Sequence, residues 1–335
     1  MLKAKVRMSR FLTRSLTASG ILAILSMTVP GAYSRDGASL PLPQGANHQP
    51  VISSNTELVA LPVNVRDAHG DFVPGLTIGN FRVFEDGKIQ NISFFEQEDT
   101  PVTLGLIVDH SGSMGPKLPE VAAAVLAFAH SSNPEDEMFV VDFADNVSVE
   151  LLNGKAFTSE AEELGKAVTA VAAQGQTALY DAVAEGFIHL QLGQWNKKAL
   201  IIVSDGGDNI SHYKFSQVLE LARTTQAVIY AIGLLSESGQ EENPGVLRRL
   251  CRETGGIAFF PQKGESIEGV STQIARDLRK QYMLGYVPPK KADADAFRKI
   301  EVKVSAPGRG DLRVRTRTGY SVAAQPPAQS GRSAP

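Results

Sequence analysis

The sequence predicts an α/β fold: a doubly wound, mostly parallel sheet flanked by helices, inserted into or flanked by a small β-sandwich built from N- and C-terminal strands. In the middle of the chain, apolar strand-like runs alternate with amphipathic helical segments, the pattern of a parallel sheet covered on both faces. Both flanks instead show strand-like alternation interrupted by turns. Neither flank alone has enough strands for a stable sandwich, so we expect the two flanks to pair with each other.

The N-terminal flank contains three strand-like runs. Residues 58–65 mix alternation with β-branched side chains, and the turn-forming stretch 67–70 follows them. The runs 81–84 and 92–95 also alternate, and Asp86-Gly87 stands between them. This dipeptide is a strong signal for a two-residue hairpin turn, so we expect a β-hairpin here.

The middle of the chain begins with the apolar run 102–108, which is typical of a buried parallel strand. The C-terminal flank returns to strand-like runs, at 282–287, 300–304 and 312–316. Between these flanks we expect, in chain order, a helix near 119–130, strands at 138–143 and 147–152, helices near 159–172 and 178–192, a strand at 199–203, a helix near 215–225, a strand at 227–234, and a helix with Ile267, Val270, Ile274 and Leu278 on one face.

The first 34 residues have the layout of a secretory signal peptide. Five basic residues and no acidic one precede an apolar segment at about 16–29, and small residues at Ala32 and Ser34 predict cleavage after Ser34. The apolar segment is shorter than the roughly 20 residues of a membrane span, so we expect no stable span after cleavage. The predicted location is therefore secreted or periplasmic.

Composition divides the rest of the chain. Residues 35–54 are rich in Pro, Gly, Ser and Asn, and the last residues in Ala, Pro, Gln and Ser, so both stretches are expected to be disordered. The expected organisation is a signal peptide at 1–34, a linker at 35–54, an N-terminal β segment at 55–99, the α/β domain at 100–280, a C-terminal β segment at 281–322 and a tail at 323–335.

Net charge argues against a nucleic-acid-binding protein, and the cysteine content rules out an intramolecular disulfide. Loss of the five positive charges of the signal peptide would take the formal net charge from −3 to −8, and an acidic mature protein argues against nucleic-acid binding. Cys251 is the only cysteine, so an intramolecular disulfide is impossible. Its apolar neighbours indicate a helix face, which favours a buried structural thiol over a nucleophile.

The end of the chain is basic. Because the charges alternate along predicted strands, a solvated face is the default expectation and a weak contact with an anion is the alternative. The residues concerned are Arg298, Lys299, Lys303, Arg309, Arg313, Arg315 and Arg317.

Polar side chains follow the first buried strand of the middle region. Asp109, Ser111 and Ser113 stand at alternate positions, so all three can turn toward one point above the sheet. Open α/β sheets bind ligands at the carboxyl ends of their strands. Hard oxygen ligands with few charges suit a divalent cation such as Mg²⁺ better than zinc. The sequence therefore predicts a cation-binding loop here.

Two later loops extend this site. Asp205 follows the strand at 199–203, and Thr177 stands at the start of a predicted helix. Taken singly, Thr177 could be only a helix N-cap and Asp205 only a turn former, and the two serines could be turn residues. Together, in this order and each beside the predicted edge of the sheet, these residues indicate one site.

This pattern resembles the von Willebrand factor type A (VWA) domain and its metal-ion-dependent adhesion site, written D-x-S-x-S, then T, then D. The resemblance covers about 100–280 and implies a Rossmann-like doubly wound sheet. The stretches 81–87 and 282–286 are also similar to the flanks of exported bacterial VWA proteins best represented in Acidobacteria. The metal ligands that the resemblance implies are Asp109, Ser111, Ser113, Thr177 and Asp205.

The resemblance also implies a division of labour among these ligands. The three hydroxyls would bind Mg²⁺, or else Mn²⁺ or Ca²⁺, directly, while the two carboxylates act directly or through water. Neutral hydroxyls leave the cation electrophilic, so an Asp or Glu carboxylate of a protein partner can fill an open sixth position. The usual Gly-Gly-Thr of the family is Gly-Gln-Thr here, so Gln176 could narrow the loop without removing the ligand.

The favoured function is an exported binding or adhesion module, not an enzyme, that engages an acidic side chain of a protein partner through the cation. The first alternative is a metal-dependent hydrolase in which the cation activates water, with His110, Asp142 or Asp208 as the base. The second is a purely structural envelope scaffold. His110 beside Ser111 does not indicate a serine hydrolase, because neighbouring side chains on an extended segment point opposite ways and no G-x-S-x-G elbow is present.

Overall fold

The computed structural model describes residues 58–97, 99–149, 151, 154–235, 242–262, 264–289 and 297–321. The predicted signal peptide, linker and C-terminal tail lie outside these residues. The chain divides into two units, Met1–Ser53 and Ser54–Pro335, and the second contains every described residue. Within the described ranges, no helix is long and apolar enough to cross a membrane.

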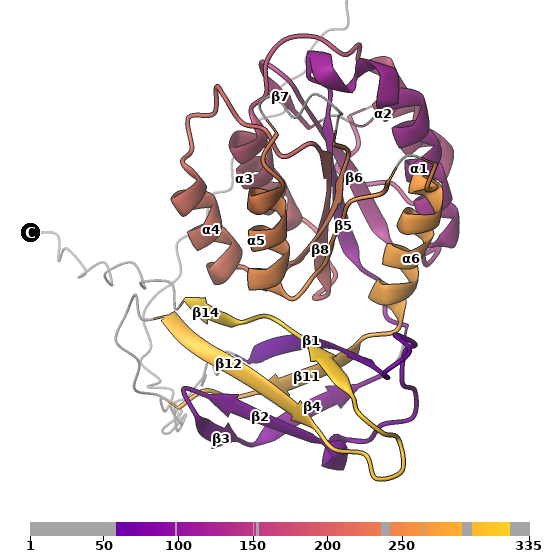
Figure 1. Cartoon of the computed structure of the whole chain (residues 1–335). Coiled ribbons are helices and arrows are strands. Elements are labelled where there is room, and N and C mark those ends of the chain that lie inside the picture. The colour runs from indigo at the N-terminus through magenta and orange to yellow at the C-terminus, as the bar shows by residue number, and fades with distance from the viewer. Residues whose placement is uncertain are drawn as a thin grey trace, which may run out of the picture. The chain divides into compact units, whose positions relative to one another are not determined.

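A six-stranded sheet in the order β10-β9-β8-β5-β6-β7 forms the centre of the α/β region (Figure 1). Neighbouring strands are parallel except β7, which pairs antiparallel with β6. Because both faces of a parallel sheet are covered, its strands must be apolar throughout, and β5 and β9 are buried along their whole lengths. The strands are β5 (Thr103–Asp109), β6 (Glu137–Phe143), β7 (Val147–Ser148), β8 (Lys198–Ser204), β9 (Val228–Gly233) and β10 (Ala258–Phe259).

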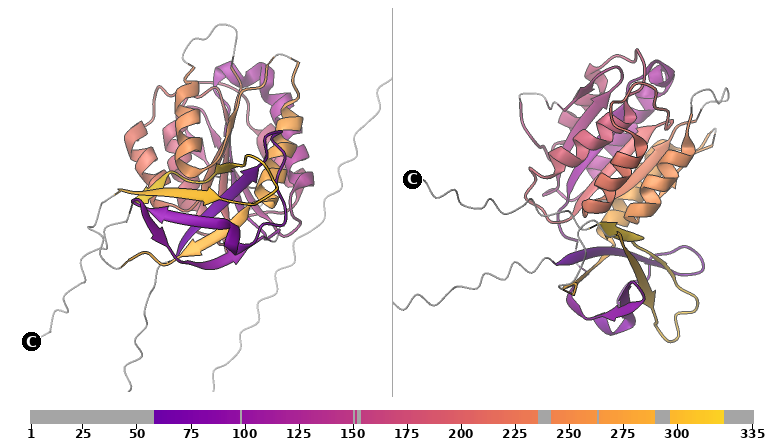
Figure 2. Two further views of the ribbon diagram at one scale, coloured as in Figure 1. Left: turned by 60° about the horizontal axis from the view of Figure 1, so that its bottom comes forward. Right: turned by 90° about the vertical axis from the view of Figure 1, so that its left-hand side faces the viewer.

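Helices cover both faces of this sheet, which confirms the predicted doubly wound architecture. Figure 1 shows α3, α4 and α5 on one side and α1, α2 and α6 on the other, and Figure 2 shows the same layers from two further directions. Strand β10 was not predicted, and helix α5 was indicated only by the apolar neighbours of Cys251. The helices are α1 (Leu118–Ser131), α2 (Ala161–Ala170), α3 (Leu179–Leu190), α4 (Phe215–Thr224), α5 (Pro244–Thr254) and α6 (Ile267–Arg279).

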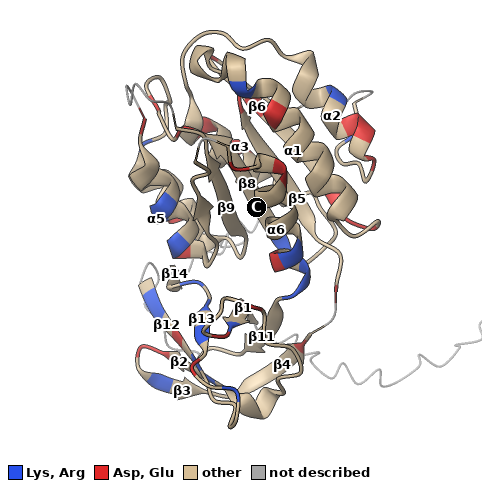
Figure 3. Ribbon diagram, turned by 45° about the vertical axis from the view of Figure 1, so that its right-hand side comes forward, with Lys and Arg blue, Asp and Glu red and all other residues tan. Residues whose placement is uncertain are grey.

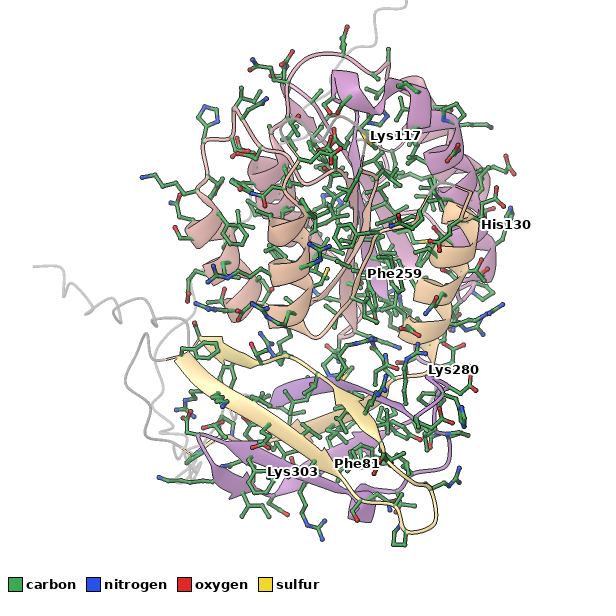
Figure 4. All side chains as sticks on the ribbon, in the orientation of Figure 1. Phe81, Lys117, His130, Phe259, Lys280 and Lys303 are labelled. Carbon is green, nitrogen blue, oxygen red and sulfur yellow. The ribbon has the colours of Figure 1, made fainter. Side chains whose placement is uncertain are left out.

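The two flanks form a sandwich of two four-stranded antiparallel sheets, in the orders β13-β1-β11-β4 and β14-β12-β2-β3. Strand β1 pairs with β11 and β2 pairs with β12, so the expectation that the flanks pair with each other is confirmed. Phe81, labelled in Figure 4, is almost fully buried in the core between these strands. The strands are β1 (Val59–Arg66), β2 (Phe81–Glu85), β3 (Lys88–Gln90), β4 (Ile92–Glu96), β11 (Tyr282–Tyr286), β12 (Phe297–Val304), β13 (Arg313–Arg315) and β14 (Gly319–Ser321).

The predicted hairpin exists, but with a different second strand. Asp86 and Gly87 have φ angles of 48° and 77°, the two positive values that a type I′ turn requires. This tight turn pairs Glu85 with Lys88, so the short strand β3 completes the hairpin. The run 92–95 was expected as the partner, and this was wrong: it forms β4, which pairs with β11 in the other sheet.

A buried polar cluster connects the two sheets of the sandwich. The Glu85 carboxylate accepts a hydrogen bond from Arg298 Nη1 at 2.5 Å, from Tyr286 Oη at 2.5 Å and from Tyr320 Oη at 2.9 Å. Tyr286 lies on β11 in one sheet, and the other three residues lie on strands of the second sheet. The expected solvated basic face is therefore wrong for Arg298, and also for Arg317, which is buried as well.

Lys197, directly before β8, predicts a pH dependence of stability. Its Nζ donates a hydrogen bond to the carbonyl oxygen of Leu278, and burial lowers the pKa of Lys197 to about 8, against the opposing effect of nearby carboxylates. Above this pKa the unfolded chain binds more protons than the folded chain, so stability rises with pH up to about pH 10.5. We expect the free energy of unfolding of the wild type to rise by about 2 kcal/mol relative to Lys197→Met between about pH 7.5 and pH 9.5.

Urea unfolding of both proteins at the two pH values measures this change. Other titrating groups affect both proteins alike, so their contributions cancel in the difference between the two free energies of unfolding. A constant difference between the two proteins would show that Lys197 is protonated throughout this range.

Candidate metal centre

The carboxyl ends of two neighbouring strands bring the two predicted carboxylates together. Asp109 is the last residue of β5, and Asp205 directly follows the last residue of β8. The strands β5 and β8 are parallel, with Val108 opposite Val203, so both chains leave the sheet at the same edge. Asp109 and Asp205 therefore start adjacent loops.

A continuous series of hydrogen bonds links four of the five predicted ligands. Ser111 N donates to Asp109 Oδ1 at 2.9 Å, and Ser111 Oγ lies 3.2 Å from Ser113 Oγ. Ser113 Oγ then donates to Asp205 Oδ2 at 3.0 Å. Residues that are 92 positions apart in the sequence thus present their oxygens to one another.

The spacing of these oxygens fits the coordination shell of a small divalent cation. Two oxygens that bind one Mg²⁺ at about 2.1 Å and at right angles are about 3 Å apart. The Ser111–Ser113 and Ser113–Asp205 oxygen pairs have this spacing. Among the described residues, no group of three or more His, Cys, Asp or Glu side chains could hold a metal ion. The predicted site is of another kind, because three of its five ligands are hydroxyls.

Thr177 is connected to this group through its backbone. Its N–H donates to Asn209 Oδ1 at 2.9 Å, and its carbonyl accepts from Asn209 N at 3.0 Å. The preceding residues of the same loop contact the first loop, where Gly112 N donates to the carbonyl of Gly175 at 3.2 Å. The hydroxyl of Thr177 makes none of these hydrogen bonds. The structure therefore brings the three loops together, and the backbone of Thr177 hydrogen-bonds to Asn209 in the third loop.

Burial varies across the site. Asp109 has no exposed surface, and Asp205 is 6% exposed, whereas Ser113 lies at the surface. Burial raises the pKa of Asp109, hydrogen bonds from Ser111 and Ser204 lower it, and the charge of Asp205 raises it again. A cation between the two carboxylates would oppose the effects that raise this pKa. The site is thus anchored in the sheet and open at Ser113.

Two glycines allow the loops to take this course. Gly175 has a φ of 78°, and a Cβ there would collide with the Asp145 carboxylate, whose Oδ1 accepts a hydrogen bond from Gln176 N at 2.8 Å. Gly206 has a φ of 84°, and a Cβ there would lie 2.5 Å from the carbonyl oxygen of Asn243. Gln176 itself is exposed, so its side chain leaves the loop rather than filling it.

Three further residues support the site and were not predicted to do so. Ser204 Oγ donates to Asp109 Oδ2 at 2.6 Å, Asn209 bonds both backbone groups of Thr177, and Asp145 holds the loop before Thr177. The only signal in the sequence is that Ser204 and Asn209 lie close to Asp205. Their roles depend on which strands are neighbours, which the local sequence does not specify.

The side chains considered as catalytic bases have other partners. His110 Nε2 donates to the carbonyl of Val168 at 2.9 Å, and its Nδ1 lies 3.3 Å from Asp142 Oδ1. Burial raises the pKa of Asp142 to about 6, and the charge of His110 opposes this. Asp208 accepts from Tyr180 N at the start of α3. In the described part of the chain, none of these three side chains hydrogen-bonds to Ser111 or Ser113.

A mostly parallel sheet with helices on both faces, and a loop site at its carboxyl edge, defines the class of open α/β domains that bind ligands at this edge. Residues 104–207 match the family model of the von Willebrand factor type A domain, and this part of the chain is a VWA domain. The match includes β5, the loop of the predicted site and β8. No curated protein matches the sequence.

Solved structures with a similar arrangement come from several bacteria. A von Willebrand factor type A protein from Catenulispora acidiphila is 11% identical, with a TM-score of 0.48, covering 81% of this chain and 75% of its own. An aerotolerance-related membrane protein from Bacteroides fragilis is 13% identical, with a TM-score of 0.45, covering 53% and 99%. The pilus adhesin SpaC from Lactobacillus rhamnosus GG is 11% identical, with a TM-score of 0.44, covering 78% and 48%.

Proposed function

We propose that this chain is an exported binding module whose VWA domain engages a protein partner through a divalent cation. The observation that carries the proposal is the row of oxygens from Ser111 through Ser113 to Asp205, with ligand-like spacing and an exposed end. The signal-peptide layout of the first 34 residues supports export. The similarity of the flanks to exported proteins of Acidobacteria supports a bacterial envelope or secreted location.

The proposed ligands have different tasks. Ser111, Ser113 and Thr177 would hold the cation with neutral oxygens. Asp109 is buried and already accepts two hydrogen bonds, from Ser111 N and Ser204 Oγ, so it would orient the first loop and bind directly or through water. When bound, the cation supplies an electrophilic position that an Asp or Glu carboxylate of the partner completes.

The surface next to Thr177 suggests further chemistry in the partner. A cleft of about 410 Å³ adjoins the loop, and its lining contains three carboxylates: Asp145, Asp181 and Glu185. Exposed apolar side chains, Ile188 and Tyr213, also line it. A partner that brings one acidic side chain to the cation would therefore bind better if it carried basic and apolar side chains nearby.

Metal titration of the purified protein tests this proposal. We expect Mg²⁺ or Mn²⁺ to raise the thermal stability of the wild type, by about 2.7 kcal/mol at a metal concentration of about 100 times the Kd, because only the folded state assembles the site. The double variant Asp109→Ala, Ser111→Ala should show no such rise. Asp181→Asn, which removes a carboxylate of the neighbouring cleft, is the matched control and should respond like the wild type.

An equal rise in the wild type and the double variant would show that the cation binds elsewhere. The prediction that the chain is not an enzyme has a separate test. Metal-dependent turnover of ester, phosphate or peptide substrates that is lost in Asp205→Ala would contradict it and support the hydrolase alternative.

A further inference from the structure

A second cleft, of about 500 Å³, lies away from the predicted metal centre. It is lined by residues 248–252 of α5, the loop from α5 to β10, strand β12 and the segment around β13. The loop from α5 enters β10, which is parallel to β9, at its amino end. The cleft is therefore at the opposite edge of the sheet from Asp109 and Asp205, and it is independent of the metal site.

The charges that line this cleft are mostly positive. Glu301 is the one acidic residue among the described lining residues, and it pairs with Lys303 at 3.3 Å, outside the cleft. Figure 3 shows basic positions on α5 and on β12, two of the elements that line the cleft. The basic residues of the lining are Arg248, Arg252, Lys299, Arg315 and Arg317.

Most of these cations have no carboxylate partner. Arg315 pairs with Asp277 at 3.1 Å. Arg317 is buried, yet its hydrogen bonds go only to backbone carbonyls, and burial lowers its pKa to about 10. Among the described residues, Arg248, Arg252 and Lys299 form no ion pair. The cleft thus holds positive charge that the described part of the chain does not neutralise.

Arg248 and Arg252 concentrate this unpaired positive charge on one face of α5. They are four residues apart on α5, so they lie on the same face of the helix, where like charges repel. Arg248 lies over the Phe260 ring at 4.2 Å from its centroid. Lys299 comes from β12, a separate element. An anion in the cleft would relieve the repulsion and bind side chains from both elements.

The rest of the lining suits an organic ligand. Ile257, Ala258, Val302 and Val314 contribute apolar surface, and the volume falls in the range of small-molecule sites. The Thr316 hydroxyl also belongs to the lining, and its oxygen is buried without a hydrogen-bond partner among the described residues.

We propose that this cleft binds a small organic ligand that carries at least two negative charges on phosphate or carboxylate groups. The guanidinium groups of Arg248 and Arg252 match such oxygens with paired N–H donors, and Lys299 adds a third charge. The apolar part of the ligand packs against the aliphatic side chains of the lining.

Calorimetric titration of the full chain, without added metal, tests the proposal. The probes are phenyl phosphate and phenylmalonate, which join a dianion to an apolar ring, with sodium chloride at matched ionic strength as the blank. We expect saturable binding of at least one probe. Binding of phenyl phosphate alone would assign the site to phosphate, and binding of phenylmalonate alone would assign it to dicarboxylates.

Matched variants locate the binding. Arg252→Gln and Lys299→Gln should each weaken binding about tenfold, the change expected for loss of one charge-assisted hydrogen bond. Arg249→Gln, on the same helix but over the Phe215 ring, and Lys303→Gln, on the same strand, should change it less than about twofold. Thermal unfolding of every variant checks that it is folded.

Two results would overturn the proposal. One is the absence of binding above the sodium chloride blank in the wild type. The other is equal weakening by the control variants, which would reveal only a general attraction of anions to a basic surface.

Discussion

Replacement of Gly206 by alanine is expected to lower the free energy of unfolding by about 2–4 kcal/mol and to weaken the proposed metal response. The residue has a φ of 84°, which an L side chain rarely adopts, and a Cβ would lie 2.5 Å from Asn243 O and 2.9 Å from its carbonyl carbon. A backbone neighbour cannot rotate away as a side chain can. Since Gly206 N donates to Ser204 Oγ, which donates to Asp109 Oδ2, a shift at Gly206 would disturb both carboxylate loops.

Urea unfolding and metal titration of Gly206→Ala measure these two effects. Gly70→Ala is the matched control, because Gly70 has a φ of 90° but a Cβ added there would meet no atom within 4 Å. This variant should show only the cost of the backbone conformation, about 1 kcal/mol. A cost for Gly206→Ala no greater than that for Gly70→Ala would refute the role of the contact with Asn243.

The second large effect is expected for Arg298→Met, which should lower the free energy of unfolding by about 3–5 kcal/mol. The substitution leaves the Glu85 carboxylate, 4% exposed, without its cationic partner. Glu85 would keep only the hydrogen bonds from the Tyr286 and Tyr320 hydroxyls. These residues join both sheets of the sandwich. Denaturant titration of the wild type and of Arg298→Met therefore measures the expected decrease in the free energy of unfolding.

Two further variants separate the loss of the buried ion pair from the loss of a positive charge on the strand. Lys303→Met removes an exposed cation from the same strand and should cost less than about 1 kcal/mol, because its pair with Glu301 is solvated. The double variant Glu85→Leu, Arg298→Met removes both buried charges and should recover part of the loss. If Arg298→Met costs no more than Lys303→Met, the buried pair does not stabilise the sandwich.

Local sequence determined most of the elements of this protein, because hydrophobic period and turn chemistry act over a few residues. The apolar run before Asp109 became β5, and Asp86-Gly87 formed the expected turn. The first three predicted ligands, Asp109, Ser111 and Ser113, also form a local motif at a strand end. The prediction of paired flanks succeeded for a related reason: each flank carried strands but too few to form a sandwich alone.

Tertiary structure decided which of these pieces meet. The bond from Ser204 to Asp109 and the link of Thr177 to Asn209 exist because β8 lies beside β5, and no local pattern specifies that neighbour. The pairing of Glu85 with Arg298, 213 positions apart, is of the same kind.

The same distinction explains the basic C-terminal strands. Alternation in the sequence predicted a solvated face, but Arg317 is buried against the end of α4, and Lys299 lines a cleft with α5. A strand has two faces, and period alone cannot say whether a helix covers the second one. The sequence by itself determined the elements and the nearest ligands of the site. The remaining contacts, the sheet that β4 joins and the charge held in the second cleft depend on packing between segments far apart in the chain.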